Sequence, residues 1–315
     1  MAGSTTSRDV DVGLLLVDDD PSAIQVMSRM LARYPHQRFA MTGQTALRLA
    51  REQTPDLIVL DAEMTGMSGF AVFAALQADP VLARVPVIFA TSHRSTVIEL
   101  TVLQQGAVDF VTKPLDADQF VARVDAHLRN RRLAQVRHAR PPALDDGSST
   151  VAMMAVADHA VLPRARAGMR LLIVDDNVAA IQMLSHTLGG LGECHFATTG
   201  AEALRLADEL APQIILLDAH LPDINGFDVC AELRTRPQCD HVPIVFITRF
   251  SDLANEKRAL DLGASDFIAK PYTPGLLLAR VSNLLALVNQ GGFEPAAGTG
   301  ARPRTGQAPV PVPPA

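Results

Sequence analysis

The chain has 315 residues, of which 48% are hydrophobic and 20% are charged, and its formal net charge at pH 7 is −6. This length suits two domains of about 150 residues each, and the balance of residue types excludes a wholly disordered chain. The acidic excess argues against a general nucleic-acid binder, and no run of about 18 apolar residues predicts a membrane span. The first residues lack the apolar stretch of a signal peptide. The three cysteines, Cys194, Cys230 and Cys239, are too few for a disulfide framework, so we expect reduced thiols and a cytoplasmic location.

Long sequence segments occur twice. LLLVDDD returns as LLIVDDN, LIVLDAEMTGMSGF as IILLDAHLPDINGF, VPVIFAT as VPIVFIT, and GAVDFVTKP as GASDFIAKP. The members of each pair are 157 residues apart, as the positions of Asp18 and Asp175 show. A constant offset of this length indicates a tandem duplication of one domain rather than a solenoid. We refer to residues 11–132 as copy one and to residues 169–290 as copy two.

In chain order, copy one alternates apolar runs with segments of helical periodicity. The runs are nearly continuous in Leu, Ile and Val, which favours strands that are covered on both faces. They predict strands at 13–17, 57–60 and 87–90, with weaker signals at 39–41 and 110–111. Between the first two, Ile24, Met27 and Leu31 recur at helical spacing. Five strands that alternate with helices predict an α/β fold with a parallel sheet and right-handed crossovers.

Three segments lack this alternation. Residues 133–168 contain Pro141, Pro142 and a polar stretch, and we interpret them as a linker. Residues 291–315 are rich in Gly, Pro and Ala and cannot form a core, so a disordered tail is expected, with a flexible N-terminus at 1–10. A basic run near the end of copy one is expected to be a solvated helical extension, with contact to an acidic partner as the alternative: Arg129, Arg131, Arg132, Arg137 and Arg140.

Acidic side chains end two strands of each copy. Asp18 and Asp19 follow the first strand of copy one, and Asp61 ends the third. The corresponding residues of copy two are Asp175, Asp176 and Asp218. Carboxyl ends of parallel strands meet at one edge of a sheet, so these carboxylates would repel one another unless a cation lay among them. Hard oxygen ligands in a site open to water and phosphate favour magnesium.

Two further residue types complete this edge. Thr91 ends the fourth strand and Lys113 follows the fifth, with Thr248 and Lys270 as their counterparts. A lysine can pair with a phosphoryl oxygen as a point charge, and a threonine hydroxyl can donate to another. Pro114 and Pro271 follow the lysines and hold them in extended conformations.

This pattern resembles the receiver domain of bacterial two-component response regulators. An acidic pair, a phosphoacceptor Asp, a Thr or Ser and a Lys-Pro pair each end the expected strand, over roughly 11–131 and 169–288. The resemblance implies two flavodoxin-like, doubly wound, five-stranded parallel sheets in tandem. It also implies a cytoplasmic phosphoprotein of signal transduction.

The resemblance also assigns a role to each site residue. Asp61 and Asp218 are expected to be phosphoacceptors, and Thr91, Lys113, Thr248 and Lys270 to contact the phosphoryl group. Magnesium ligands are expected at Asp18, Asp19, Asp61 and the backbone of Glu63, and at Asp175, Asp176, Asp218 and the backbone of His220. Phe110 and Phe267 occupy the position of the switch aromatic, and plain core packing is the alternative reading of both.

The expected function is that of a response regulator. It would accept phosphate from a sensor histidine kinase or a histidine phosphotransfer protein and signal through protein–protein contacts, with slow acyl-phosphate hydrolysis as its only catalysis. A homodimer through the helix 4–strand 5–helix 5 face is one option. No membrane contact or direct DNA binding is expected, since the residues after copy two are too few for a helix-turn-helix domain.

Other readings rest on particular segments. The RPQCDHVPIVFIT and GASDFIAKPY stretches resemble receivers that precede diguanylate cyclase domains, so a regulatory module of such a protein, lacking its output domain, is the alternative function. Asp61 to Thr65 also resembles the DxDxT motif of haloacid-dehalogenase phosphatases, but copy two reads DAHLP and loses the match. Arg249 follows Thr248 where the family has a small residue, and we expect it to slow the access of phosphodonors to Asp218.

Overall fold

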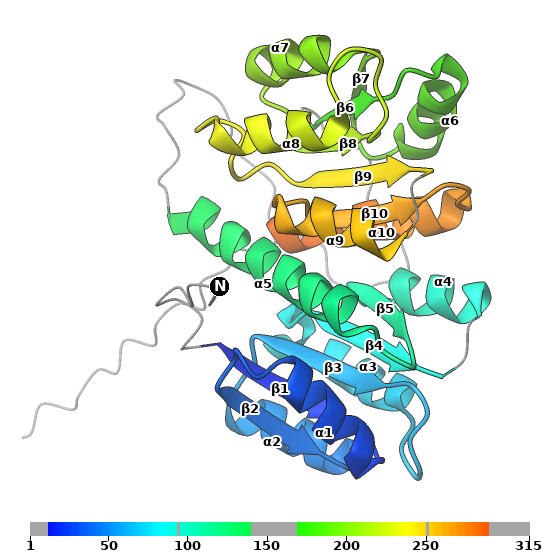
Figure 1. Ribbon diagram of the computed structural model, residues 1–315. Helices are drawn as coiled ribbons and strands as arrows, with labels where there is room; N and C mark the ends of the chain where they lie inside the picture. The colour runs from blue at the N-terminus through cyan, green and yellow to red at the C-terminus, as the bar shows by residue number, and fades with distance from the viewer. Residues whose placement is uncertain (1–11, 93–94, 140–168, 250–251, 290–315) are drawn as a thin grey trace, which may run out of the picture.

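The computed structural model describes residues 12–92, 95–139, 169–249 and 252–289 (Figure 1). The predicted N-terminal segment, the tail and nearly all of the linker lie outside these residues. Copy one comprises β1 (Gly13–Val17), α1 (Pro21–Met30), β2 (His36–Ala40), α2 (Gly43–Glu52), β3 (Leu57–Asp61), α3 (Gly69–Gln77), a 3-10 turn (Leu82–Arg84), β4 (Val87–Thr91), α4 (Thr96–Gln104), β5 (Asp109–Thr112) and α5 (Ala117–Ala139).

Copy two repeats this order. It comprises β6 (Arg170–Val174), α6 (Val178–Leu188), β7 (Glu193–Ala197), α7 (Gly200–Leu210), β8 (Ile214–Leu217), α8 (Gly226–Thr235), β9 (Ile244–Thr248), α9 (Leu253–Asp261), β10 (Asp266–Ala269) and α10 (Pro274–Asn289). Within the described residues, no helix is long and apolar enough to cross a membrane.

Each copy forms one five-stranded parallel sheet. The strand order is β2-β1-β3-β4-β5 in copy one and β7-β6-β8-β9-β10 in copy two. In copy one, Val17 pairs with Leu60, and Asp61 pairs with Ala90. This register brings the residues that follow β1 and end β3 to one edge of the sheet. The predicted fold class, two flavodoxin-like sheets in tandem, is confirmed.

Local sequence signals account for the elements that border this edge. Asp20 caps α1 by accepting a hydrogen bond from the N–H of Ser22, and Pro21 occupies the first turn, where its missing N–H costs nothing. Gly106 follows α4 with a φ of +101°, a conformation that favours glycine. The strands β3 and β4 are buried along their whole length, which agrees with their continuous apolar runs.

The helices α4 and α5 of copy one pack against α9 and α10 of copy two (Figure 1). We refer to this contact, together with the starts of β5 and β10, as the inter-copy interface. The apolar cluster of copy two includes Ala122 and Ala126 from copy one, and the cluster of copy one includes Ala279 from copy two. The helix 4–strand 5–helix 5 face, which we expected to be available for a homodimer, is therefore covered by the other copy of the same chain. A homodimer stays a prediction.

The arginines near the end of copy one are bonded to protein carbonyls. Arg129 donates to the carbonyl of Leu260, and Arg131 donates to the carbonyls of Pro55 and Asp56, at 2.6, 2.9 and 2.5 Å. The expectation of a solvated extension is wrong for these two residues, because Arg129 packs against copy two and Arg131 against the segment before β3 of its own copy. Arg140 lies outside the described residues.

Candidate functional site

An ion-paired lysine occupies the centre of the predicted site in copy one. Lys113 Nζ lies 2.6 Å from Asp18 Oδ2 and 2.8 Å from Asp61 Oδ1. The backbone N–H of Lys113 donates to the carbonyl of Thr91, which ties the end of β4 to the segment after β5. Asp18, Asp61 and Thr91 are all buried. The structure thus brings together predicted residues from four different strands.

The acidic pair is held by backbone donors. Asp18 Oδ1 accepts from the N–H of Asp20 at 3.0 Å, and Asp19 Oδ2 accepts from the N–H of Thr65 at 2.7 Å. The second bond lowers the pKa of Asp19 and fixes its carboxylate against the loop that follows β3. Both aspartates are therefore oriented by the fold.

Burial and the ion pair have opposite effects on the pKa values of this cluster. Burial raises the pKa of Asp61 above its usual value, and the hydrogen bond from Lys113 only partly offsets this. Burial alone would lower the pKa of Lys113, but its hydrogen bonds to Asp18 and Asp61 raise it above the usual value. The lysine therefore stays cationic at neutral pH and offers its charge to an incoming anion.

Copy two repeats the arrangement around a cavity. Lys270 Nζ lies 2.6 Å from Asp175 Oδ2 and 3.1 Å from Asp218 Oδ2. The cavity has a volume of about 580 Å³ and is lined by Asp175, Asp176, Asn177, Ala180, Asp218, His220, Thr248, Arg249 and Lys270. Arg249 is exposed and lines this cavity, as its place in the sequence predicted.

Each copy gathers three carboxylates that are close enough to share a cation. In Asp18, Asp19 and Asp61, and in Asp175, Asp176 and Asp218, one oxygen of each residue lies within 4.8 Å of the other two. Oxygen donors of this type fit magnesium, whereas thiolate or imidazole ligands would favour other metals. The predicted backbone ligands at Glu63 and His220 stay predictions.

The two aromatics at the switch position are core residues in this structure. Phe110 and Phe267 are 7% and 5% exposed, and Phe267 stacks with Phe246 at a centroid distance of 6.5 Å. Both therefore point into the apolar cluster of their own copy. Core packing describes them as they stand, and a switch role stays a prediction.

Sequence reasoning missed two glycines beside the phosphoacceptor positions. A Cβ added at Gly69 would lie 2.0 Å from the carbonyl oxygen of Asp61, and one at Gly226 would lie 2.1 Å from that of Asp218. Only glycine lets the start of α3 or α8 approach the strand end so closely. The signal was available, because both repeated motifs carry a glycine eight residues after the aspartate.

Known proteins share this pattern. The sequence model described as the response regulator receiver domain matches residues 14–125 and 171–282. The chain belongs to this family. Response regulator PleD of Caulobacter vibrioides is 28% identical over 269 residues, which cover 85% of this chain and 58% of PleD. The DNA-binding response regulator MtrA of Mycobacterium leprae is 41% identical over 113 residues, which cover 36% of this chain and 49% of MtrA.

One solved receiver structure has the length of a single copy. Chemotaxis protein CheY4 of Vibrio cholerae is 30% identical, covers 37% of this chain and 98% of its own, and gives a TM-score of 0.35. The chain spans just over half the length of PleD and about half of MtrA. It thus consists of two receiver domains of the two-component response regulator type, and the sequence-based recognition of the family is confirmed.

The raised pKa of Asp61 predicts a pH-dependent effect on stability. Its charged form destabilises the fold above the raised pKa, and this penalty disappears as the pH falls below the usual value of 3.8. In magnesium-free buffer, Asp61→Asn should raise the free energy of unfolding at about pH 7, and the gain should shrink toward about pH 4. Urea unfolding at several pH values measures this.

Asp228→Asn is the matched control, because Asp228 is exposed in the first turn of α8. Removing the charge of Asp228 should lower the free energy of unfolding by at most about 0.3–1 kcal/mol, because the interaction with the helix dipole is weakened. An Asp61→Asn protein that is no more stable than the wild type at neutral pH would show that burial does not dominate at this site.

Proposed function

We propose that each copy accepts a phosphoryl group from a phosphohistidine, on Asp61 in copy one and on Asp218 in copy two. The observation that carries this proposal is the partly buried lysine of each copy, which lies between two aspartates at the strand ends. A cation held beside an aspartate is what a carboxylate needs in order to approach an anionic donor. Membership of the receiver family supports the same conclusion.

The transfer is an in-line displacement. A carboxylate oxygen of Asp61 attacks the phosphorus, the bond from phosphorus to the imidazole nitrogen breaks, and an acyl phosphate forms. Lys113 pairs with one equatorial oxygen, and the hydroxyl of Thr91 donates to another. Positioning and charge neutralisation supply most of the catalysis, because the aspartate is held in place before the donor arrives.

Magnesium would complete the charge balance. Asp18, Asp19 and Asp61 would hold it in copy one, and Asp175, Asp176 and Asp218 in copy two. When bound, the ion neutralises the negative charge that the phosphoryl oxygens bring to a site rich in carboxylates. Lys113 cannot do this alone, because it already pairs with two carboxylates.

We further propose a sensor histidine kinase or phosphotransfer protein as the donor, a protein target as the output, and a cytoplasmic location. The alternative, a regulatory module for a diguanylate cyclase-type output domain, is favoured by the stretch at 236–248, which resembles receivers that precede such domains. The chain matches only part of PleD, which fits both the stand-alone regulator and the regulatory module. Purification of the native protein, followed by identification of the proteins bound to it, would discriminate between these two proposals.

The phosphoacceptor assignment predicts the number of phosphates that the full chain accepts. With magnesium and a small phosphodonor such as acetyl phosphate, wild type should take up to two, and Asp61→Asn or Asp218→Asn should take at most one. The double variant should take no phosphate. Intact mass spectrometry counts the phosphates on each protein. Asp20→Asn is the matched control, because asparagine can still cap α1. This variant should still accept two phosphates. Phosphate on the double variant would refute the assignment.

The position of Arg249 predicts that the two copies differ in their rates of phosphorylation and dephosphorylation. Its side chain lines the cavity of Asp218, so it should hinder both the donor and the water that hydrolyses the acyl phosphate. In an Asp61→Asn background, Arg249→Ala should raise both rates by about two- to fivefold, the range for an exposed charged group worth about 0.5–1 kcal/mol.

Acyl-phosphate formation and decay, followed by mass, measure these rates. The control is Ser92→Ala in an Asp218→Asn background, at the matching position of copy one, where little change is expected. Slower phosphorylation of Arg249→Ala would show that the arginine assists the chemistry.

A further inference from the structure

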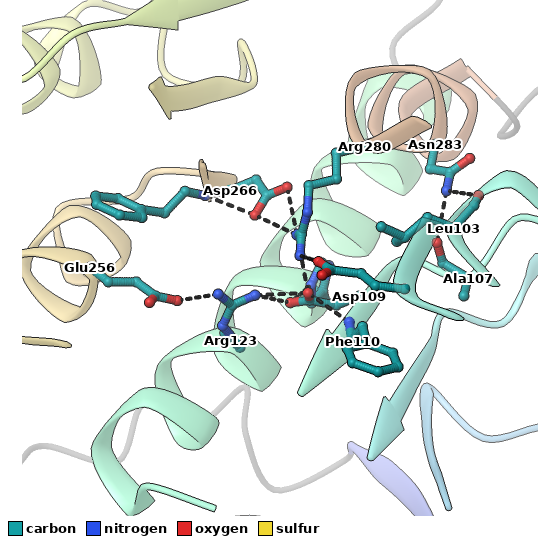
Figure 2. A network of polar contacts seen from close by, with 12 residues as sticks. Leu103, Ala107, Asp109, Phe110, Arg123, Glu256, Asp266, Arg280 and Asn283 are labelled. Atoms are coloured by element: carbon teal, nitrogen blue, oxygen red, sulfur yellow. Dashed lines mark hydrogen bonds and ion pairs between the residues drawn. The ribbon is translucent and has the colours of Figure 1, made fainter. Parts of the chain in front are cut away.

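The two ends of the inter-copy interface can be compared position by position, because its contacts follow the duplication (Figure 2). Arg123 of copy one pairs with Glu256 of copy two at 2.5 Å, and Arg280 of copy two pairs with Glu99 of copy one at 3.1 Å. Arg123 and Arg280 are counterparts at the 157-residue offset, and so are Glu99 and Glu256. Each position at one end of the interface therefore has a counterpart at the other end.

At the copy-two end, an arginine occupies the space where two helices end. Arg234 lies in the last turn of α8, and its guanidinium donates to the carbonyls of Cys239, Val242 and Gly263 at distances of 2.9 and 3.0 Å. Gly263 is the second residue after α9. Carbonyls at a helix end form the negative end of its dipole and favour a cation. One guanidinium thus joins three carbonyls from separate segments.

At the copy-one end, the matching space is a cavity of about 80 Å³, which we call the inter-copy cavity. Gln77 stands at the position of Arg234, and Val85 and Gly106 also line the cavity. A Cβ added at Gly106 would lie 3.7 Å from the amide nitrogen of Gln77, so the glutamine lies beside this glycine as the arginine does in copy two. The glutamine side chain is shorter than that of the arginine, which leaves the outer part of the space empty of side chains.

The walls of the inter-copy cavity hold hydrogen-bond acceptors that no side chain uses. Within the described residues, no side chain donates to the carbonyls of Val85 and Gly106, and the amide of Gln77 forms no hydrogen bond. Gly106 and Gly263 have φ values of +101° and +95°, so the chain takes the same course after α4 as after α9. The carbonyls that hold the guanidinium in copy two therefore have counterparts with the same orientation in copy one.

The opposite wall comes from α10 of copy two. Asn283 donates to the carbonyls of Leu103 and Ala107 at 2.6 and 2.7 Å (Figure 2). At the copy-two end, the matching carbonyls accept from Arg129, whose counterpart on α10 is Ala286. These two carbonyls are thus satisfied at both ends. The cavity exists because Gln77 and Ala286 are each shorter than the arginine at the matching position.

The electrostatics of the inter-copy cavity favour a cation. Gln77 is the last residue of α3, and Gly106 is the second residue after α4. The negative ends of two helix dipoles therefore meet at the cavity. Arg84 also lines it, but this residue is exposed, so solvent screens its charge.

We infer that the inter-copy cavity is a binding site for a guanidinium group that comes from outside the chain. Its planar fork of N–H donors suits carbonyls that diverge from one point, as Arg234 shows in copy two. The volume equals that of about two or three water molecules, which suits a group of so few atoms. This inference goes beyond the proposed function and does not depend on it.

The test measures the binding of methylguanidinium to the full chain by saturation-transfer NMR. We expect one site with a dissociation constant of about 1 mM, because so small a ligand makes few contacts. Gln77→Arg places the arginine of copy two in the cavity, and it should weaken binding by about tenfold or more. The same variant should raise the midpoint of thermal unfolding, because its guanidinium satisfies the same carbonyls.

Three controls locate the site and define its chemistry. Gln25→Arg adds the same charge at an exposed position of α1 and should change the affinity by less than about twofold. A chain with both Asp61→Asn and Asp218→Asn should bind as the wild type does, which excludes the acidic sites. Methylammonium, a cation without the planar fork, should bind at least about fivefold more weakly.

Two further ligands distinguish the sources of the group. Free arginine that binds at least as tightly as methylguanidinium would indicate a small metabolite. Tighter binding of arginine blocked at both its amino and carboxyl groups would indicate the side chain of another protein. The guanidinium site stands in both cases.

A wild-type chain that binds no methylguanidinium at tens of millimolar would overturn the inference, because the cavity would then hold only water. Equal binding of methylammonium would overturn it as well, since charge alone would be recognised. Should Gln77→Arg fail to fold, Ala286→Arg narrows the cavity from copy two and is expected to act in the same direction. Binding that a folded variant of either position leaves unchanged would place the ligand elsewhere and contradict the inference.

Discussion

The orientation of the two copies depends on one buried arginine. Arg280 lies between Asp109 of copy one and Asp266 of copy two, and all three side chains are buried. A charge buried without a partner costs several kcal/mol, so few relative positions of the copies are compatible with this triad. Water would solvate the same groups in separated copies, so the ion pairs fix the geometry more than they add affinity. The apolar contacts of Ala122, Ala126 and Ala279 supply the favourable burial.

This constraint joins two sites that lie on different sheets. The strand that carries Asp109 into the interface leads to Lys113 in the phosphoacceptor site, and copy two repeats this from Asp266 to Lys270. Each copy covers part of the face that the fourth helix, fifth strand and fifth helix of the other copy form.

The site was predictable from the sequence, and the interface was not. Asp18, Asp61 and Lys113 could be placed together because strand ends in a parallel sheet meet at one edge, and the repeat supplied each residue twice. Arg123 and Arg280 gave no such signal, since an arginine on a helix is usually solvated and each of these also pairs with a residue of the other copy. Arg129 and Arg131 were mistaken for solvated residues because their partners are backbone carbonyls, which a run of arginines does not reveal. Gly69 was missed because its role depends on the distance to the carbonyl of Asp61, which spacing alone does not reveal.

The packing of the copies is tested most directly by cutting the chain between them. A protease site placed within residues 140–168 would yield two fragments, and size-exclusion chromatography would show whether they stay together. The account predicts that they coelute as one complex at micromolar concentration, and that Glu99→Arg makes them separate. Fragments of the otherwise unchanged chain that elute apart would contradict it.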